Sequence, residues 1–501
     1  MRPSLKAWTS GSPGRETATN SERILGRQHS STKVTRPLFD SSTTCDIEVS
    51  AATLLQPHVL MQRAGLAVAQ LAIALAPHAR TIWIACGPGN NGGDGFEAAR
   101  HLLGWGKTPI ITSLGEATNL PADAQAARQG ALEAGVVFAD TIPEDCDLCI
   151  DAIFGIGRIR PLEGQCKEWV QRMNTGTAPV ISIDIPSGLA ADTGCGQAVH
   201  VKAHFTLSLL TLKPGLFTAD GREACGEIWF NSLGVVPRLA PCALLSASPP
   251  SVVRAHNTHK GNYGDVAVIG GAPGMTGAAL LAARAALHGG AGRVYVGLLD
   301  ANATQLDAAQ PGLMFRLPSE LQLESLTVVA GCGGGDSIHA HLAEILTRSR
   351  RLVLDADALN AIAQDTSLRG KLTARGPGTT VLTPHPLEAA RLLRLSTQDV
   401  QTDRLGALHS LVNQFACTAV LKGSGTMIGA PDTLPHINPT GNARLATAGT
   451  GDVLAGLLGA RWAMEDSAFS AACSAVFHHG HVADAWHTQS ALTAQGLVQA
   501  L

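Results

Sequence analysis

Residues 81–95, which read TIWIACGPGNNGGDG, decide the fold of the first half of the chain. The apolar run 81–86 predicts a buried strand, and a helical pattern through 98–103 follows the glycine-rich turn. A strand, a tight turn and a helix in this order open a βαβ unit, which is typical of a parallel sheet. Gly87, Gly89 and Gly92 have the GxGxxG spacing of dinucleotide-binding turns, and Glu116 ends the next expected strand. The stretch therefore predicts an α/β domain with a ligand site at the carboxyl ends of its strands.

Short apolar runs and helical patterns alternate along the chain in two separate series. The first series has a helical stretch at 54–76 and further expected strands at 109–113, 147–151, 179–184 and 205–212. The second series has expected strands at 265–270, 293–298, 327–330, 351–355, 380–383 and 418–422. A proline-rich stretch at 235–251 separates them. The 501 residues are therefore expected to form two α/β/α domains, 38–235 and 252–501, joined by a linker at 236–251.

The composition excludes several classes of protein. Charged residues are only 15% of the chain, and the formal net charge of −3 lacks the basic excess of a nucleic-acid binder. No run of about 18 apolar residues predicts a membrane span. The eleven cysteines are odd in number and scattered, so a disulfide framework is not indicated and a cytoplasmic location is expected. Cys146 and Cys149 form an isolated CxxC pair within an apolar run and are interpreted as strand cysteines.

Residues 1–37 differ in composition from the rest of the chain. They contain seven Lys or Arg, two acidic residues and many Ser and Thr, so their charge is +5 and that of the remainder is −8. Transit peptides have such a composition. A disordered tail or a misassigned start site fits equally well. The segment is expected to be an unstructured leader, and no function is assigned to it.

Polar residues gather where the strands of the first series end. Asn90, Asn91 and Asp94 place two amides and a carboxylate among glycines that permit a close backbone approach. Asp151 and Asp184 end two later strands. Because the carboxyl ends of parallel strands meet at one crevice, these groups are expected to converge on one ligand. The alternative interpretations are a capped turn for the loop and helix caps for the two acids.

Three motifs together resemble the NAD(P)H-hydrate epimerase domain: GNNGGDG at 89–95, DAIFGIGRIRP at 151–161 and SIDIPSG at 182–188. The resemblance covers roughly 37–235 and implies a Rossmann-like fold that epimerises the hydrated cofactors NADHX and NADPHX. It implies that Asp184 transfers the proton, a role for which a carboxylate of adjusted pKa is suited. It also implies a K⁺ ion bound by Asn91, Asp151 and Ser187. The residues implied to hold the substrate are Asn90, Asn91, Gly92, Gly93, Asp94, Gly155, Ile156, Gly157, Arg158, Ile159, Arg160, Pro161 and Asp184.

The second series carries its chemistry near residues 446–456, ATAGTGDVLAG. Apolar residues at helical spacing follow Gly449 and Gly451, so these glycines are expected at a helix N-terminus, where backbone N–H groups and the helix dipole favour a phosphate. Asp452 would repel that phosphate unless it acts as a general base, the alternative being an acid favoured by the dipole alone. The sequence KGSGT at 422–426 offers a cation and close-approach backbone to a nucleotide. His385, held between two prolines at a strand end, is a candidate ligand contact.

These features resemble the ADP-dependent NAD(P)H-hydrate dehydratase of the ribokinase-like superfamily, over about 250–495. Further matches are HKG at 259–261, MTGAALLAAR at 275–284, DADALN at 355–360 and NPTGN at 438–442. The residues implied to contact the hydrated nicotinamide are Ala278, Gly335, His385 and Asp452. Those implied to bind the adenine nucleotide are Lys422, Gly423, Ser424, Gly425, Thr426 and Gly451. The chain departs from the family patterns at Ile156, Arg158, Gly312 and Cys332, where Thr, Leu, Glu and Pro are usual.

Together the resemblances imply a bifunctional enzyme that repairs nicotinamide cofactors. The first domain would interconvert the R and S hydrates, and the second would dehydrate the S form with ADP, giving AMP and phosphate. Mg²⁺ is expected with the nucleotide because it neutralises phosphate charge. A homo-oligomer is also expected. The alternative hypotheses are a ribokinase-like vitamin or sugar kinase, a dehydrogenase based on the GxGxxG spacing, and a non-catalytic first domain.

Overall fold

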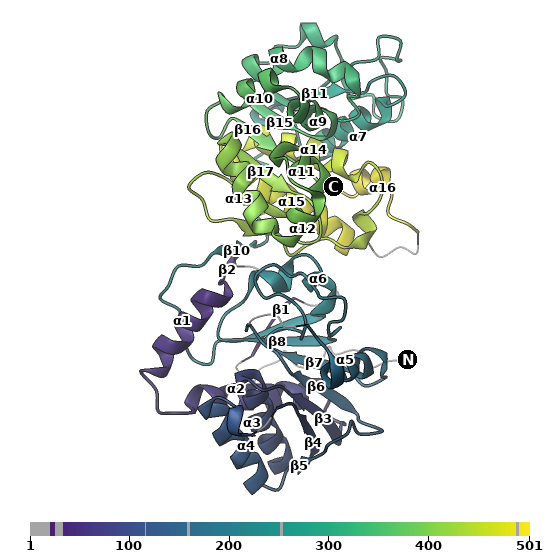
Figure 1. Cartoon of the computed structure of the whole chain (residues 1–501). Helices are drawn as coiled ribbons and strands as arrows, with labels where there is room; N and C mark the ends of the chain where they lie inside the picture. Colours follow the sequence, from purple (N-terminus) through teal and green to yellow (C-terminus); the bar gives the residue numbers. More distant parts are fainter. Residues whose placement is uncertain (1–20, 26–33, 116, 158–160, 251–253, 487–489) are drawn as a thin grey trace.

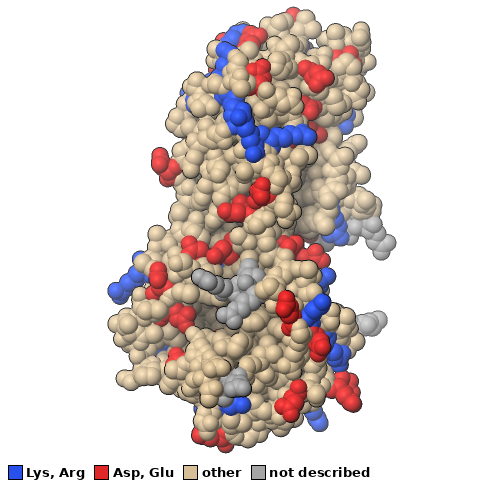
Figure 2. Space-filling view, in the orientation of Figure 1, with Lys and Arg blue, Asp and Glu red and all other residues tan. Residues whose placement is uncertain are grey.

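The computed structural model contains two β-sheets, each flanked by helices, one in either half of the chain (Figure 1). It describes residues 21–25, 34–115, 117–157, 161–250, 254–486 and 490–501. Glu116, Arg158, Ile159 and Arg160 lie outside the described residues. On the face drawn in Figure 2, uncharged surface separates most of the acidic and basic side chains. Within the described ranges, no helix is both long and apolar enough to cross a membrane.

The first sheet has eight strands within the described ranges, and only its edge strand β1 runs antiparallel to its neighbour. Its order is β1 (Glu22–Leu25), β9 (Glu227–Asn231), β8 (Phe205–Leu209), β7 (Val180–Ile183), β6 (Leu148–Ala152), β3 (Thr81–Cys86), β4 (Thr108–Ser113) and β5 (Val137–Phe138). The chain order reverses between β3 and β6. A ligand crevice is therefore expected outside the carboxyl ends of these two strands.

The second sheet has eleven strands, counted over the part of the chain that the structure describes. Its order is β13 (Met314–Phe315), β12 (Arg293–Leu298), β11 (Asp265–Gly270), β14 (Thr327–Ala330), β15 (Arg351–Leu354), β16 (Thr380–Leu382), β17 (Thr418–Leu421), β18 (Met427–Gly429), β19 (His436–Ile437), β10 (Ala243–Leu245) and β2 (Arg36–Leu38). Strands β13 to β17 are parallel, and β18 is antiparallel to both of its neighbours. The chain order reverses between β11 and β14, which marks a second crevice.

Each sheet is covered by helices on both faces. In the first sheet, the side chains of β3 point alternately toward the helices on one face and on the other. In β3, Ile82 and Ile84 belong to the cluster that contains α2, α3 and α4, whereas Trp83 packs edge-on against Trp169 of α5, with ring centroids 6.5 Å apart. The helices of the first half are α1 (Ser41–Ala52), α2 (Val59–Leu75), α3 (Asn90–Gly104), α4 (Ala122–Glu133), α5 (Gly164–Thr175) and α6 (Gly221–Ala224). Those of the second half are α7 (Thr276–His288), α8 (His339–Arg348), α9 (Ala356–Gln364), α10 (Thr366–Thr373), α11 (Pro386–Leu393), α12 (Thr397–Thr402), α13 (Arg404–Phe415), α14 (Thr450–Met464), α15 (Ala468–Asp484) and α16 (Ala494–Gln499). The predicted α/β/α class is confirmed for both domains.

Strand positions follow the hydrophobic pattern closely. The strands expected at 81–86, 265–270, 293–298 and 327–330 are confirmed to the residue. The strand expected at 205–212 ends earlier, at Leu209. The backbone turns there, because Leu210 has a positive φ of 65°.

Two short strands cross the expected domain boundaries. β2 lies at the expected boundary of 37/38, and β10 lies inside the expected linker 236–251, yet both pair within the second sheet. The first half of the chain therefore supplies a strand to the second domain. Local patterns did not predict this pairing, because β10 extends the sheet at the edge of β19 and β2 pairs with β10, and both partners lie far away in the chain.

The expectation that residues 1–37 lack structure is wrong for Glu22–Leu25. These residues form β1 along the edge of β9, and the side chain of Ile24 is buried. A strand of four residues is too short for its alternation to be recognised among polar neighbours. Residues 1–20 and 26–33 lie outside the described part of the chain.

Candidate active sites

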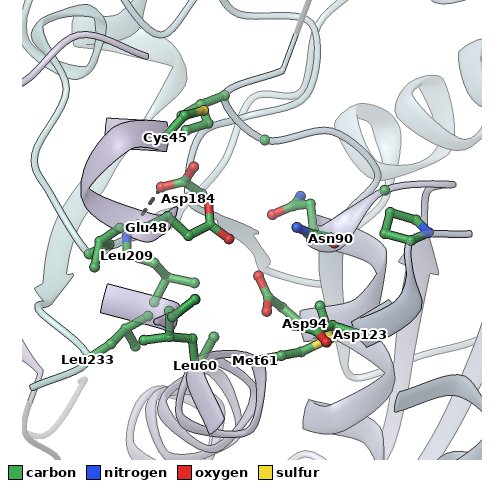
Figure 3. Close-up of a pocket in the computed structure, with 18 of the residues that line it drawn as sticks. Cys45, Glu48, Leu60, Met61, Asn90, Asp94, Asp123, Asp184, Leu209 and Leu233 are labelled. Atoms are coloured by element: carbon green, nitrogen blue, oxygen red, sulfur yellow. Dashed lines mark hydrogen bonds between the residues drawn. The ribbon is translucent and has the colours of Figure 1, made fainter. Parts of the chain in front are cut away.

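A cavity of about 630 Å³ lies at the carboxyl ends of β3, β6 and β7, where the first sheet reverses its chain order. In Figure 3, Asp184 and Glu48 face Asn90 and Asp94 across this cavity, and apolar side chains such as Leu60 close one side. The sequence-predicted residues that line it are Asn90, Asn91, Asp94, Gly155, Ile156, Gly157 and Asp184. Residues that follow three separate strands therefore meet in one crevice, with acidic and amide groups from the ends of β3 and β7.

Asp184 follows β7 in a left-handed backbone conformation, with a φ of +67°. Its Oδ1 accepts hydrogen bonds from the Nζ of Lys213 and from the backbone N–H of Leu209, the latter at 3.3 Å. Lys213 is fully buried and also donates to the carbonyl oxygen of Leu209 at 2.8 Å. A left-handed backbone is unfavourable for a residue other than glycine, and such strain is concentrated at functional sites. The carboxylate of Asp184 is thus held toward the cavity by a buried cation.

Asp151, at the end of β6, is fully buried and arranges the residues around it. Its two oxygens accept four hydrogen bonds, from the hydroxyls of Ser182 (2.8 Å) and Ser187 (2.6 Å) and from the N–H groups of Ser187 (2.9 Å) and Ile153 (3.3 Å). Burial raises the pKa of Asp151, and these donors oppose the rise because they stabilise the ionised form. The Ser187 hydroxyl also accepts from the N–H of Phe154 at 2.9 Å.

Asn91, at the N-terminus of α3, is the most buried of the three polar residues Asn90, Asn91 and Asp94. Its side chain is buried, and its Nδ2 atom has no hydrogen-bond partner among the described residues. A Cβ atom at Gly155 would lie 3.3 Å from Oδ1 of Asn91 and 3.4 Å from Oδ2 of Asp184. Asn91 and Asp184 therefore flank the second loop from both sides. The unpaired amide of Asn91 is the kind of buried polar group that a bound ion or ligand satisfies.

Two further acids in the cavity have raised pKa values. Burial is the main cause for both Asp94 and Glu48, and the nearby charge of Asp184 adds to it. Asp94 is on α3 and Glu48 is on α1, so the two come from different elements. The site therefore combines one carboxylate paired with a buried lysine and two carboxyl groups whose pKa values are raised.

Glycines in the first turn of α3 permit close contacts that a side chain would prevent. A Cβ atom at Gly92 would overlap the carbonyl oxygen of Gly87, and one at Gly93 would lie 2.5 Å from the methyl group of Met61. In the second loop, Ile156 packs against the main hydrophobic cluster and Pro161 is exposed.

The second site lies where β14, β15 and β17 end against the N-terminus of α14. The Sγ of Cys332 and carboxylate oxygens of Asp355 and Asp452 all lie within 4.8 Å of one another. Lys422 donates from Nζ to Oδ1 of Asp355 at 2.6 Å. The pKa of Asp452 is raised to about 6, first by burial and then by the charge of Asp355, while a hydrogen bond from Cys332 opposes the rise. Asp452 therefore has the pKa of a base that works near neutral pH.

His385 and Glu388 form the rim of this second site. His385 caps α11 by accepting from the N–H of Leu387 at 3.1 Å, and Glu388 accepts from the N–H of His385 at 2.8 Å. Burial is the main cause that raises the pKa of Glu388 to about 7. Burial, followed by the charge of Lys422, lowers the pKa of His385. The exposed His385 imidazole is thus presented in a fixed position in its neutral form.

The remaining sequence-predicted residues lie around Lys422 and the loop 331–335. A Cβ atom at Gly451 would lie 3.5 Å from Nζ of Lys422, and a Cβ at Gly333 would lie 2.8 Å from that of Ala278. The N–H of Gly335 donates to Oδ2 of Asp357 at 2.8 Å. In the loop after Lys422, the hydroxyl of Thr426 donates to the carbonyl oxygen of Gly423 at 3.1 Å, whereas Ser424 and Gly425 contact the first domain.

The two sites offer different donors to metal ions. Asn91, Asp151 and Ser187 supply only oxygen and amide groups, and the unpaired Asn91 amide fits a role toward an alkali cation, since amide oxygen and nitrogen positions are interchangeable by a flip. At the second site, the thiol of Cys332 is a soft ligand that Mg²⁺ does not prefer. The cluster of Cys332, Asp355 and Asp452 is therefore better suited to holding a proton than to holding Mg²⁺.

Glu48, Lys213 and Glu388 are among the polar residues of these sites that were not predicted from the sequence. Lys213 follows β8 and could have been found by the rule that located Asp151 and Asp184, since it too comes just after a strand. Glu388 follows His385 by three positions, the spacing of a capping box. Glu48 lies on α1, which has almost no amphipathic pattern, and carries no comparable signal.

Each of the two sheets carries acidic groups near the point where the chain order of its strands reverses. Such an arrangement defines an α/β enzyme with two sites. Residues 57–215 match the family model of the YjeF-related protein N-terminus, and residues 266–501 match that of NAD(P)H-hydrate dehydratase. The bifunctional NAD(P)H-hydrate repair enzyme Nnr of Escherichia coli is 37% identical over 85% of this chain and 84% of its own length. The corresponding proteins of Coxiella burnetii and Leishmania braziliensis are 34% and 33% identical over 86% and 90% of this chain, and over 90% and 89% of their own lengths. The chain belongs to the family of bifunctional NAD(P)H-hydrate repair enzymes.

The family assignment gives this chain an epimerase-type domain followed by an NAD(P)H-hydrate dehydratase domain. It favours cofactor repair over the alternative of a vitamin or sugar kinase. Among solved structures, an ADP/ATP-dependent NAD(P)H-hydrate dehydratase from Bacillus subtilis is 28% identical, with a TM-score of 0.42 over 50% of this chain and 91% of that chain.

Proposed function

We propose that Asp184 transfers the proton in the epimerase reaction and that Lys213 holds its carboxylate in place. The observation that carries this proposal is the buried pair of Asp184 and Lys213, aimed into the cavity. The carboxylate of Asp184 accepts a hydrogen bond from the buried Lys213 ammonium group, whereas burial raises the pKa values of Asp94 and Glu48. Asp184 thus faces Asp94, a carboxyl group of raised pKa, across the cavity, which suits the exchange of a proton between the two faces of one carbon.

The substrate would lie between the two loops that border this cavity. The proposed contacts are Asn90, Asn91, Gly92, Gly93, Asp94, Gly155, Ile156, Gly157 and Pro161, with Arg158, Ile159 and Arg160 outside the described residues. Asn91, Asp151 and Ser187 would hold K⁺, which would supply positive charge beside the substrate. The buried, oxygen-rich donor set and the unpaired Asn91 amide support this assignment.

In the dehydratase domain, we propose Asp452 as the general base. It would accept the proton of the hydrate's hydroxyl as that oxygen attacks the terminal phosphorus of ADP, and the bond from this phosphorus to AMP would break. Phosphate would then leave with the C–O bond electrons and a proton would leave the neighbouring carbon, so that the C=C bond re-forms and NADH or NADPH is regenerated. The pKa of about 6 supports this role, because Asp452 is ionised at neutral pH and is a stronger base than an aspartate of ordinary pKa. Ala278, Gly335 and His385 would contact the hydrated nicotinamide.

The adenine nucleotide would be bound by Lys422, Gly423, Ser424, Gly425, Thr426 and Gly451. The ammonium group of Lys422, close to Gly451 at the N-terminus of α14, supports a phosphate position there. Mg²⁺ would neutralise the phosphates and is proposed to be held mainly by them, since Cys332 disfavours a direct protein site. A reducing cytoplasm is proposed as the location, because all eleven cysteines are free thiols.

Incubation of the full-length protein with mixed R,S-NADHX and ADP tests the two activities together. Absorbance of the reduced nicotinamide should recover completely, because epimerisation feeds the S form to the dehydratase. Recovery that stops at the S fraction would contradict an active epimerase domain. Phosphorylation of hydroxymethylpyrimidine or pantothenate in place of NADHX turnover would instead favour the kinase hypothesis.

A further inference from the structure

The loop that follows β17 in the dehydratase domain is bonded at its tip to the epimerase domain. The carbonyl oxygen of Ser424 accepts hydrogen bonds from the hydroxyl of Thr218 (3.1 Å) and from the N–H of Ala219 (3.2 Å). The hydroxyl of Ser424 donates to the carbonyl oxygen of Ala219 at 2.8 Å. The tip of a proposed ADP-binding loop is therefore held by residues about two hundred positions earlier in the chain.

The two backbones approach too closely for a side chain at the contact. Gly425 has a φ of +65°, and a Cβ atom there would overlap the carbonyl oxygen of Phe217. Phe217, Leu216 and Leu421 belong to one buried cluster that extends from the first domain into the second. The contact is thus part of a continuous hydrophobic core and is not a contact between two solvated surfaces.

Arg404, the first residue of α13, joins both sides of this contact. Its side chain is buried, with 1% of the residue exposed. It donates from Nε to the hydroxyl of Thr218 at 3.1 Å and from Nη2 to the carbonyl oxygens of Leu421 (3.3 Å) and Lys422 (3.2 Å). Nη1 donates to Oε1 of Gln401 at 2.7 Å. No carboxylate is among its hydrogen-bond partners in the described part of the chain. Burying an arginine without a counter-ion is costly unless its N–H groups are hydrogen-bonded. The guanidinium group of Arg404 therefore holds these carbonyl oxygens in place.

A second bond from the same segment reaches another loop of the dehydratase domain. Arg222 donates to the carbonyl oxygens of Pro439 and of Gly441, the latter at 2.7 Å. Gly441 is fixed in turn by Asp484, which accepts from its N–H at 2.9 Å. Residues 218–222 of the first domain therefore hold two loops of the second domain at once.

We propose that residues 218–222 form a structural part of the dehydratase's nucleotide site, with Arg404 as the positioning residue that transmits their effect to the loop 422–426. The proposal rests on the assignment of that loop to ADP. The affinity of the second domain for ADP then depends on the docked first domain. By linkage, ADP also strengthens the docking of the two domains.

Replacing Thr218 by Val tests this inference in the full-length protein. Valine has nearly the same shape but removes the hydroxyl that joins Ser424 and Arg404. The dehydratase KM for ADP and the calorimetric Kd for ADP should both rise roughly 5- to 10-fold, with kcat and the epimerase rate little changed. The matched control is Thr206→Val, because Thr206 is equally buried in the same domain but its hydroxyl bonds within the first domain, to the carbonyl oxygen of Cys225 at 2.7 Å. This control should leave the KM for ADP unchanged.

A second variant, Arg404→Lys, keeps the charge and removes the fork of donors. It should raise the KM and the Kd for ADP in the same way, and its epimerase rate reports whether the chain is folded. Wild-type ADP affinity in both Thr218→Val and Arg404→Lys would overturn the inference. A rise in Thr206→Val as large as that in Thr218→Val would also overturn it, because a general loss of stability would then explain both. If the wild-type protein itself bound no ADP, the assignment of the loop would fail first.

Discussion

Lys213 is completely buried beneath Asp184, and its ammonium group donates a hydrogen bond to Oδ1 of that carboxylate. The two residues follow β8 and β7, which are neighbouring parallel strands, so their side chains meet at one edge of the sheet. Asp184 adopts a positive φ at this point, which turns its carboxylate toward the cavity. The pair is thus built by the sheet rather than by the local sequence around either residue.

Replacing Lys213 by Met should lower the rate of R-to-S epimerisation by about 100-fold or more, because Asp184 loses the buried ammonium group that holds its carboxylate toward the cavity. The dehydratase rate on pure S-NADHX should remain near the wild-type value. Both rates can be measured separately by supplying one epimer at a time. Lys107→Met is the matched control, since Lys107 donates hydrogen bonds to the backbone carbonyls of Pro77 and Ala79 at the far end of the sheet. Wild-type epimerisation in the Lys213 variant would contradict the proposed role of the pair.

The pH profile of the dehydratase should have an acid limb near pH 6, where Asp452 becomes protonated and ceases to be a base. Cys332 donates a hydrogen bond to this carboxylate and so opposes the rise of its pKa. Cys332→Ala should therefore move the acid limb to higher pH, by about half a unit to one unit. Cys417→Ala, at another buried position of the same domain, should leave the limb in place. The measurement is kcat/KM for S-NADHX between about pH 5 and pH 8, and an unmoved limb in the Cys332 variant would exclude this tuning.

Glu388 should make the folded protein less stable as the pH rises. Its pKa in the folded state is about 7 against an ordinary value of 4.5, so the folded state holds a proton more tightly than the unfolded state. Stability is therefore lost between about pH 4.5 and pH 7, as the buried side chain ionises. Glu388→Gln keeps an oxygen acceptor for the N–H of His385 and should raise the free energy of unfolding by about 1–2 kcal/mol near pH 8, with no gain near pH 4.

Denaturant unfolding of this variant at the two pH values checks the prediction. Glu344→Gln serves as the control, because Glu344 is exposed on α8 and pairs with Arg348. A gain of equal size at both pH values would show that ionisation of Glu388 is not the cause.

K⁺ should raise the thermal stability of the protein in a manner that depends on the Ser187 hydroxyl. An ion that binds only the folded state raises the melting temperature with its concentration. Ser187→Ala removes a proposed ligand and should abolish the difference between KCl and an equal concentration of tetramethylammonium chloride. Ser182→Ala is the control, because Ser182 also donates to Asp151, at 2.8 Å, but is not a proposed ligand. Equal K⁺ dependence in both variants would argue against the site.

The strands were predictable because each buried strand carries its own signal. The run 81–86 alternates between two helical layers but is apolar throughout, since both faces of a parallel sheet are covered. Asp151, Asp184 and the Asn90–Asp94 segment could be placed at one crevice by the same logic. β1, β2 and β10 escaped prediction because three or four residues at a sheet edge have too little pattern, and their partners lie far away in the chain.

The sequence by itself determined two α/β domains, the motifs that place the chain in its family, and the acids at the strand ends. These features are local, since the periodicity of apolar residues, the turn glycines and the spacing of the motifs each depend on residues that are close together in the sequence. Only the tertiary structure decided that Lys213 lies under Asp184, that Cys332 bonds to Asp452, and that Thr218 and Arg404 hold the loop at Ser424. Such contacts depend on which strand ends become neighbours and how two sheets dock. Burial then sets the charge of each group, because a side chain's solvation is a property of the fold rather than of its position in the sequence.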